Sequence, residues 1–219
     1  MDTPESPPPI GEAIANSVTH GLGLLASLVA LPIVVLSAAQ RDDALQVTGA
    51  AIYGVSLVLL YGASTVYHSL VNSPARRILR TIDHSAIYIL IAGSYTPFAL
   101  GPLRGSFGYT LLAVVWTMAF AGIAMKFLRG FGKPWMTVVP YVAMGWVAVL
   151  AIRPLWNHVG SAGVMWLLAG GLCYTGGTVF YANDTRIRYG HAVWHLFVLA
   201  GSACHFFAVL WHSGASKAG

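Results

Sequence analysis

Charged side chains are scarce in this chain. Of its 219 residues, 12 are Lys or Arg and 7 are Asp or Glu, so 9% are charged, whereas 57% are hydrophobic. Ordinary soluble domains carry roughly 25% charged residues. A chain with so few charges cannot cover its surface with groups that water solvates, which excludes a soluble domain. We therefore expect a protein that is dissolved in a lipid bilayer.

Several motifs of soluble proteins are also absent. The sequence contains no glycine-rich phosphate loop, no nucleophile elbow and no internal repeat at a fixed period. Its two cysteines, Cys173 and Cys204, are isolated among apolar residues and are predicted to behave as small hydrophobic side chains. The basic residues are scattered over loops, so the net charge of +5 indicates attraction to lipid headgroups and no binding of nucleic acid.

Seven apolar stretches of roughly 18 residues or more are long enough to cross a bilayer as helices. They are apolar on every face, which disfavours the alternating strands of a β-barrel. The predicted fold is therefore all-α, with seven transmembrane helices in a single domain over residues 12–219, preceded by a disordered tail over residues 1–11. The spans lie near residues 17–39, 45–71, 82–102, 107–126, 134–152, 159–181 and 191–212.

The Lys and Arg residues between the spans predict the orientation of the bundle, because such residues in short loops are retained on the cytoplasmic side. The even-numbered loops hold more of them than the odd-numbered loops and the C-terminus, which predicts a cytoplasmic N-terminus and an outside C-terminus. The short loops favour the inner membrane of a bacterium. The first group is Arg76, Arg77, Arg80, Lys126, Arg129, Lys133, Arg186 and Arg188; the second is Arg41, Arg104, Arg153 and Lys217.

Four ionisable residues are predicted at one depth in this bundle. The second span ends at His68, the third begins near Asp83, and the last begins with His191 and His195. Ionisable groups are costly in hydrocarbon, so a group of them indicates a functional site. Two histidines four residues apart lie about 6 Å from each other on one helix face and can bind one ion. A third histidine completes the three-ligand site with one open position that is typical of catalytic zinc.

Asp83 and Ser64 are predicted to act beside this ion. Asp83 is the one carboxylate well inside an apolar span, and it is placed to accept a proton from a zinc-activated water. Ser64 lies one turn deeper than His68 and can steady that water or donate to a substrate carbonyl. The alternative is that the paired histidines only hydrogen-bond to neighbouring helices.

A polar stripe of Glu12, Asn16 and His20, spaced four residues apart, begins the first span. We predict that this stripe lines the entrance to the site, with His20 as a reserve ligand, although a helix cap would explain part of it. His84 is predicted to point away from the carboxylate that precedes it. His205 is predicted to hydrogen-bond between helices.

Four ordered blocks of sequence resemble bacterial hemolysin III proteins, which belong to the progestin and adiponectin receptor family. The blocks are E-A-I-A-N-S-V-T-H (12–20), S-T-V-Y-H (64–68), D-H-S-A-I-Y-I-L-I-A-G-S-Y-T-P-F (83–98) and H-A-V-W-H-L-F-V-L-A-G-S-A-C-H-F (191–206). The resemblance spans nearly the whole chain. It implies seven helices, an inside N-terminus and a zinc ion near the cytoplasmic face. It also implies zinc ligands at His68, His191 and His195, with Asp83 at the metal-bound water and Ser64 beside it.

The same family resembles alkaline ceramidases, which share this layout of Ser, His, Asp and paired His. That resemblance implies hydrolysis of a lipid amide or ester, with a ceramide-like or fatty amide substrate drawn from the membrane. The assignment as an enzyme stays open, because a non-catalytic sensor or regulator of membrane lipids with a structural zinc fits the same residues. A pore-forming hemolysin is disfavoured because the polar groups crowd at one face. The sequence predicts no oligomeric state.

Overall fold

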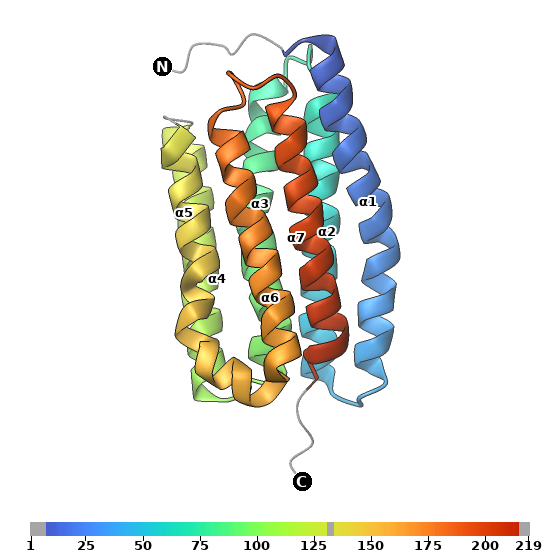
Figure 1. The fold of residues 1–219 in the computed structure, drawn as a ribbon, viewed down its shortest axis with the longest axis vertical. Coiled ribbons are helices and arrows are strands. Elements are labelled where there is room, and N and C mark those ends of the chain that lie inside the picture. Colours follow the sequence, from blue (N-terminus) through green and yellow to red (C-terminus); the bar gives the residue numbers. More distant parts are fainter. Residues whose placement is uncertain (1–7, 131–133, 215–219) are drawn as a thin grey trace.

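A computed structural model describes residues 8–130 and 134–214, and over these residues the chain is all-helical (Figure 1). Successive helices run in opposite directions along one long axis. The predicted all-α class is confirmed. The helices are α1 (Ile10–Ala39), α2 (Ala44–Ser69), α3 (Arg76–Leu100), α4 (Ser106–Arg129), α5 (Pro134–Trp146), α6 (Ile152–Ala182) and α7 (Gly190–His212), and a short 3-10 helix, η1 (Val147–Ala151), joins α5 to α6.

Five helical segments of the described chain are long and apolar enough to cross a membrane. One of them runs over Trp135–Ala182, because α5, η1 and α6 follow each other directly in the chain; within α6 the backbone leaves helical geometry at Gly160, where φ is 70°. The helix α3 is not among the five, since Arg76, Arg77 and Arg80 fill its first turns and hydroxyl-bearing side chains are frequent in the rest. Length and composition thus support fewer spans than the seven predicted, and the count of seven remains a prediction.

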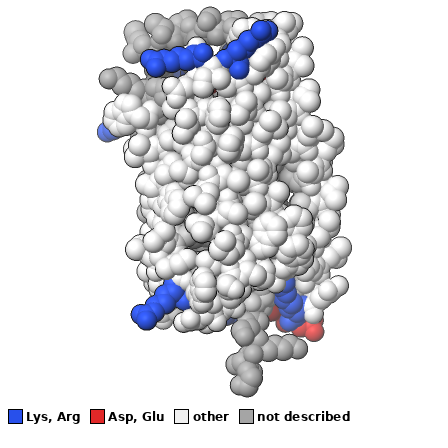
Figure 2. All heavy atoms as spheres, in the orientation of Figure 1, with Lys and Arg blue, Asp and Glu red and all other residues white. Residues whose placement is uncertain are grey.

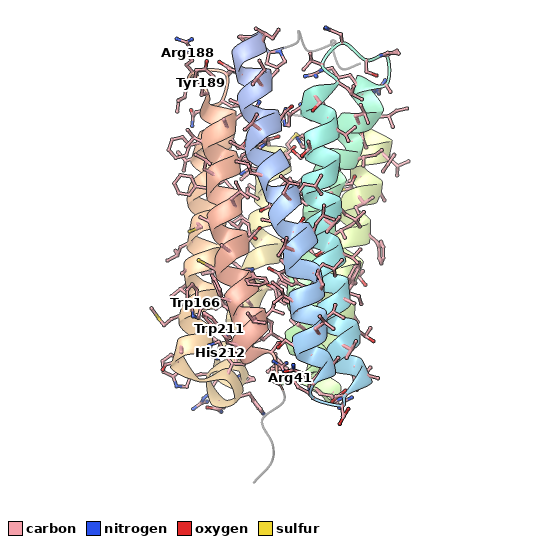
Figure 3. All side chains as sticks on the ribbon, turned by 90° about the vertical axis from the view of Figure 1, so that its right-hand side faces the viewer. Arg41, Trp166, Arg188, Tyr189, Trp211 and His212 are labelled. Atoms are coloured by element: carbon pink, nitrogen blue, oxygen red, sulfur yellow. The ribbon has the colours of Figure 1, made fainter. Side chains whose placement is uncertain are left out.

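The surface of the bundle is apolar between its two ends. Figure 2 shows Lys and Arg near both ends of the face in view and a broad band without charge between them. Large apolar side chains such as Leu25, Leu36 and Phe120 are exposed on the helices. Trp166 and Trp211 lie near one end (Figure 3), as aromatic residues do at membrane interfaces. This distribution suits a protein surrounded by lipid.

Small residues let the helices approach closely, as expected where lipid supplies no hydrophobic force between them. At Gly49 of α2, an added Cβ would lie 2.9 Å from the Cα of Pro97 in α3. At Gly201 of α7, an added Cβ would lie 2.8 Å from the ring of Tyr174 in α6. These contacts hold α3 against α2 and α7 against α6, so glycine at both positions is a packing requirement.

The helix α1 begins at Ile10, with Pro9 before it, so the helical region starts two residues earlier than the predicted boundary at Glu12. Residues 1–7 of the predicted disordered tail lie outside the described residues. The alternating helix directions place the starts of α1, α3 and α7 at the same end as the ends of α2 and α6 (Figure 1). This arrangement brings buried polar residues of α1, α2, α3 and α7 to one end of the bundle.

Candidate metal centre

Three histidines from two helices meet at this end of the bundle. His68 lies in the last turn of α2, and His191 and His195 lie one turn apart at the start of α7. One ligand nitrogen of each lies within 4.8 Å of those of the other two. The ring centroids are 4.8 to 5.0 Å apart in all three pairs, so the rings surround a common centre. The structure therefore brings together all three residues that the sequence predicted as ligands.

The donor set fits a metal ion. Both ring nitrogens of His68 are buried without a hydrogen-bond partner, and so are Nε2 of His191 and Nε2 of His195. A buried polar group that lacks a partner is costly. A divalent cation bound by imidazole nitrogens satisfies such groups. The geometry supports a metal site and leaves the identity of the metal open.

The other ring nitrogen of each α7 histidine is already engaged. Nδ1 of His191 lies 3.0 Å from Oδ2 of Asp184, and Nδ1 of His195 lies 3.1 Å from Oγ1 of Thr19. A carboxylate only accepts, so Nδ1 of His191 carries the proton. The Thr19 hydroxyl donates to backbone carbonyls one turn earlier in α1, so it accepts from His195. Both histidines consequently offer the lone pair of Nε2 to an ion.

Asp83 is buried in α3, and its nearest described ionic partner is its neighbour. Oδ2 of Asp83 lies 3.2 Å from Nδ1 of His84. The prediction that His84 points away from this carboxylate is wrong, because the ring turns back along α3, where Nδ1 also lies 3.0 Å from the carbonyl of Arg80. On its other side, Nε2 of His84 lies 3.1 Å from the hydroxyl of Tyr181. Asp83 is thus held in place by contacts outside the histidine cluster.

Ser64 and the polar stripe lie inside the protein. Ser64 is 1% exposed, one turn before His68, and its Oγ is buried without a partner. In the stripe, Asn16 and His20 are buried, whereas Glu12 is half-buried. The ring of His20 stacks on that of His195, with centroids 3.4 Å apart. Among the described residues the ligand cluster comprises three histidines and does not include His20. The entrance role and the reserve-ligand role stay predictions.

An apolar cavity of ≈ 210 Å³ runs through the bundle beside this site, and none of the three clustered histidines lines it. Asp83 and His20 line one end of it, and Leu103 and Leu111, from the far end of the bundle, line the other. Most of its wall is Leu, Ile, Val, Tyr and Trp from α3, α5, α6 and α7. Such a cavity suits a hydrocarbon chain. His205 also lines it and bonds from Nε2 to the carbonyl of Leu167 in α6 at 3.2 Å, which confirms the predicted interhelical hydrogen bond.

Sequence reasoning missed Asp184 and Thr19. Asp184 lies in the loop between α6 and α7, and loop carboxylates are usually solvated. Thr19 directly precedes His20 and is not one of the stripe positions, which recur every four residues, so no sequence pattern singled it out. No pattern in the sequence analysis singled out Asp184, which stands seven positions before His191.

Fold and site together define an all-helical membrane protein with a buried histidine cluster that can hold a metal ion. The family described as Haemolysin-III related matches residues 10–206, and the chain belongs to this family. The predicted membership is confirmed. The chain is accordingly an integral membrane protein.

Named relatives cover most of the chain. It is 45% identical over 205 residues to the Hemolysin-3 homolog of Bacillus subtilis (strain 168), and the aligned region covers 93% of this chain and 95% of the relative. It is 44% identical over 205 residues to Hemolysin-3 of Bacillus cereus, with 93% and 92% covered. It is 32% identical over 209 residues to the human Monocyte to macrophage differentiation factor, with 90% and 83% covered. No solved structure gave a significant match.

Proposed function

We propose that this chain is a zinc-dependent hydrolase of the bacterial inner membrane, which cleaves an amide or ester bond of a lipid with water. One observation carries the proposal: Asp83, buried beside His84, lines the apolar cavity at the end of the bundle where three histidine nitrogens converge. Asp83 thus links two features: it lines the cavity, and it lies at the same end of the bundle as the histidine cluster, whose three members do not line the cavity. Three histidines with an open position are typical of catalytic zinc.

His68, His191 and His195 would hold the ion. When bound there, such an ion polarises a carbonyl oxygen and lowers the pKa of water. Asp83 would take the proton from the attacking water and pass it to the leaving nitrogen or oxygen, so that a carboxylic acid and an amine or alcohol result. The hydroxyl of Ser64, which is buried without a partner, would donate a hydrogen bond to the substrate carbonyl.

The cavity would hold the acyl chain of the substrate. Its wall is almost entirely apolar, and it leads away from Asp83 along the bundle axis. A lipid amide or ester fits this layout, because its scissile bond joins a polar head to a long hydrocarbon tail. A ceramide-like or fatty amide substrate is therefore favoured over a water-soluble one.

We further propose that the chain crosses the membrane seven times, with the metal centre at the cytoplasmic end. Seven basic residues lie at that end of the described bundle: Arg76, Arg77, Arg80, Lys126, Arg129, Arg186 and Arg188. At the opposite end lie Arg41, Arg104 and Arg153, while Lys133 and Lys217 fall outside the described residues. Basic residues are retained on the cytoplasmic side, which favours an inside N-terminus.

The test of hydrolysis uses purified protein loaded with zinc and offered ceramides, fatty amides and fatty esters in mixed micelles. Wild type should release fatty acid. Asp83→Asn should keep its zinc and lose roughly 10²–10⁴-fold in rate, which is what a general base contributes. His158→Gln, a change at an exposed histidine at the other end, is the matched control and should keep full activity. A zinc-loaded wild type that turns over none of these lipids contradicts the proposal.

The second candidate is a non-catalytic sensor or regulator of membrane lipids. The positions of the ligand residues favour it: they lie on α2 and α7, so a bound ion would link two helices that are far apart in sequence. Chelation separates the candidates. A large fall in the thermal midpoint on removal of the metal supports a structural ion, whereas loss of turnover with little change in the midpoint supports a catalytic one.

A further inference from the structure

The loop between α6 and α7 carries a carboxylate that reaches the metal centre. We infer that Asp184 is a positioning residue: it accepts a hydrogen bond from Nδ1 of His191, fixes the ring with Nε2 toward the ion, and thereby sets how tightly the ion is held. The inference rests on the metal site of the proposed function and requires no reaction.

The contact itself is short and well placed. Oδ2 of Asp184 lies 3.0 Å from Nδ1 of His191, within the range of a charge-assisted hydrogen bond. The opposite nitrogen of the same ring, Nε2, is buried and has no partner. One side of the ring is thus anchored by a carboxylate, while the other side faces the two remaining histidines.

The loop is shaped so that this contact can form. Its backbone turns back on itself, with hydrogen bonds from Arg186 and Ile187 to the carbonyl of Asn183 at 2.9 and 3.0 Å. Tyr189 then adopts a left-handed conformation, with φ of 58°, just before α7 begins. At Gly190, an added Cβ would lie 3.2 Å from the Cα of Asp184, tighter than most such contacts.

A role as a helix cap does not account for Asp184. Acidic side chains before a helix commonly accept from the first backbone N–H groups. The helix α7 has no side-chain cap, however, and the described hydrogen bond of the Asp184 carboxylate goes to the imidazole. This contact orients a ring, which is what a metal site needs.

His191 differs from its two companions in the charge of its partner. His195 is held by the neutral hydroxyl of Thr19, and neither ring nitrogen of His68 has a described hydrogen-bond partner. A carboxylate behind a histidine fixes its tautomer and makes it a better electron donor to a metal. The Asp184 and His191 side chains are 29% and 16% exposed, so water reaches this pair more readily than the buried ring of His195.

The experiment measures zinc affinity in the full-length chain after removal of metal with a chelator. Asp184→Ala should bind zinc 10–100-fold more weakly than wild type, the usual effect of losing such a partner. Asp184→Asn should lose less, because its amide oxygen still accepts from Nδ1. Asp42→Asn is the matched control, an exposed acid at the opposite end of the bundle, and should bind as wild type does.

Two further readouts separate positioning from a general structural role. The thermal midpoint of the metal-free protein should be the same in wild type and Asp184→Asn, while the rise in midpoint on adding zinc should be smaller in the variant. Cobalt(II), used in place of zinc, should give a visible absorption spectrum that shifts in Asp184→Ala and not in Asp42→Asn, because only the former frees a ligand ring.

Equal zinc affinity in Asp184→Ala and wild type would overturn the inference. So would a fall in the metal-free midpoint of Asp184→Asn large enough to explain its weaker binding. A wild type that binds zinc and hydrolyses no lipid contradicts the proposed reaction alone, since the affinity series still decides the role of Asp184. A wild type that binds no divalent ion contradicts both.

Discussion

The imidazole rings of His20 and His195 lie face to face, with centroids 3.4 Å apart and planes 14° from parallel. The contact joins the first helix to the last, and the ring of Tyr61 in α2 lies nearly perpendicular to that of His20, with centroids 5.0 Å apart. His20 is 2% exposed, yet it lies outside the ligand cluster. His20 therefore belongs to the site through its packing against His195.

Replacing His20 by Phe should leave zinc stoichiometry unchanged, because a flat ring keeps the stacking and His20 supplies no nitrogen to the cluster. His20→Ala removes the stacked ring and should lower the free energy of unfolding by about 1–3 kcal/mol, typical of a buried truncation. Metal analysis and thermal melts on both variants provide the measurement. Loss of zinc from His20→Phe would show that His20 is a ligand after all.

Single replacement of any ligand by Ala should empty the metal site. His68→Ala, His191→Ala and His195→Ala each leave two nitrogens where three converge, which is too few to hold zinc against a chelator. Metal content per protein, measured after purification, should fall close to zero in all three. His158→Ala, at an exposed position on α6, should retain the wild-type content. Full zinc content in any ligand variant would contradict the assignment.

Thr19 should support His195 through its hydroxyl. In Thr19→Val the shape is kept but the hydroxyl that accepts from Nδ1 is lost, which leaves the backbone of Asn16 as the remaining hydrogen-bond partner of the ring and costs about 1 kcal/mol, typical of one hydrogen bond. Zinc affinity and thermal stability should both fall. Thr19→Ser keeps the oxygen and should stay close to wild type in both measurements. If Val and Ser behave alike, the hydroxyl has no such role.

At the opposite end of the bundle, the charge of Asp43 should make the stability of the folded protein depend on pH. Its carboxylate caps α2 through the backbone N–H of Leu45 at 3.0 Å and accepts two bonds from Arg104 at 2.9 and 3.1 Å. Partial burial raises the pKa of Asp43, but these bonds and those from Gln46 outweigh it, and the pKa lies below its usual value. A lowered folded-state pKa stabilises the protein above the unfolded pKa of about 3.9.

That stabilisation is lost as the pH falls through the folded-state pKa. Asp43→Asn keeps the cap but removes the charge. Its thermal midpoint should lie below that of wild type at pH 7, and the difference should shrink as the pH falls below about 4. Melts of both proteins from pH 7 to pH 3 measure this difference directly. A gap that stays constant across the range would rule out the charge as its cause.

The far end of the cavity should limit the length of the acyl chain. Leu111 lines it and is largely buried, so Leu111→Trp fills space far from the histidines. If hydrolysis is confirmed, this variant should lose activity on long-chain substrates and keep it on short-chain ones. An equal loss of activity on both substrates would indicate misfolding. Overpacking a buried site costs about 1–3 kcal/mol, so thermal melts of the variant check its fold.

Much of the candidate site was predictable from local spacing. His191 and His195 are one helical turn apart, and α-helix geometry alone sets both rings on one face. The depth of His68 followed from the length of its apolar span. The direction of the His84 ring did not follow, because a ring on a helix has several rotamers and its contacts with Arg80 and Tyr181 selected one.

By itself the sequence determined that this protein is helical and dissolved in lipid, since its scarcity of charge and its long apolar runs allow no other solvent. It also determined which histidines share a helix face. Only the tertiary structure decided which groups stand behind those histidines. Thr19 reaches His195 because α1 packs against α7, and Asp184 reaches His191 because the loop before Gly190 turns back on itself. Such contacts join positions with no fixed spacing, so no local pattern encodes them.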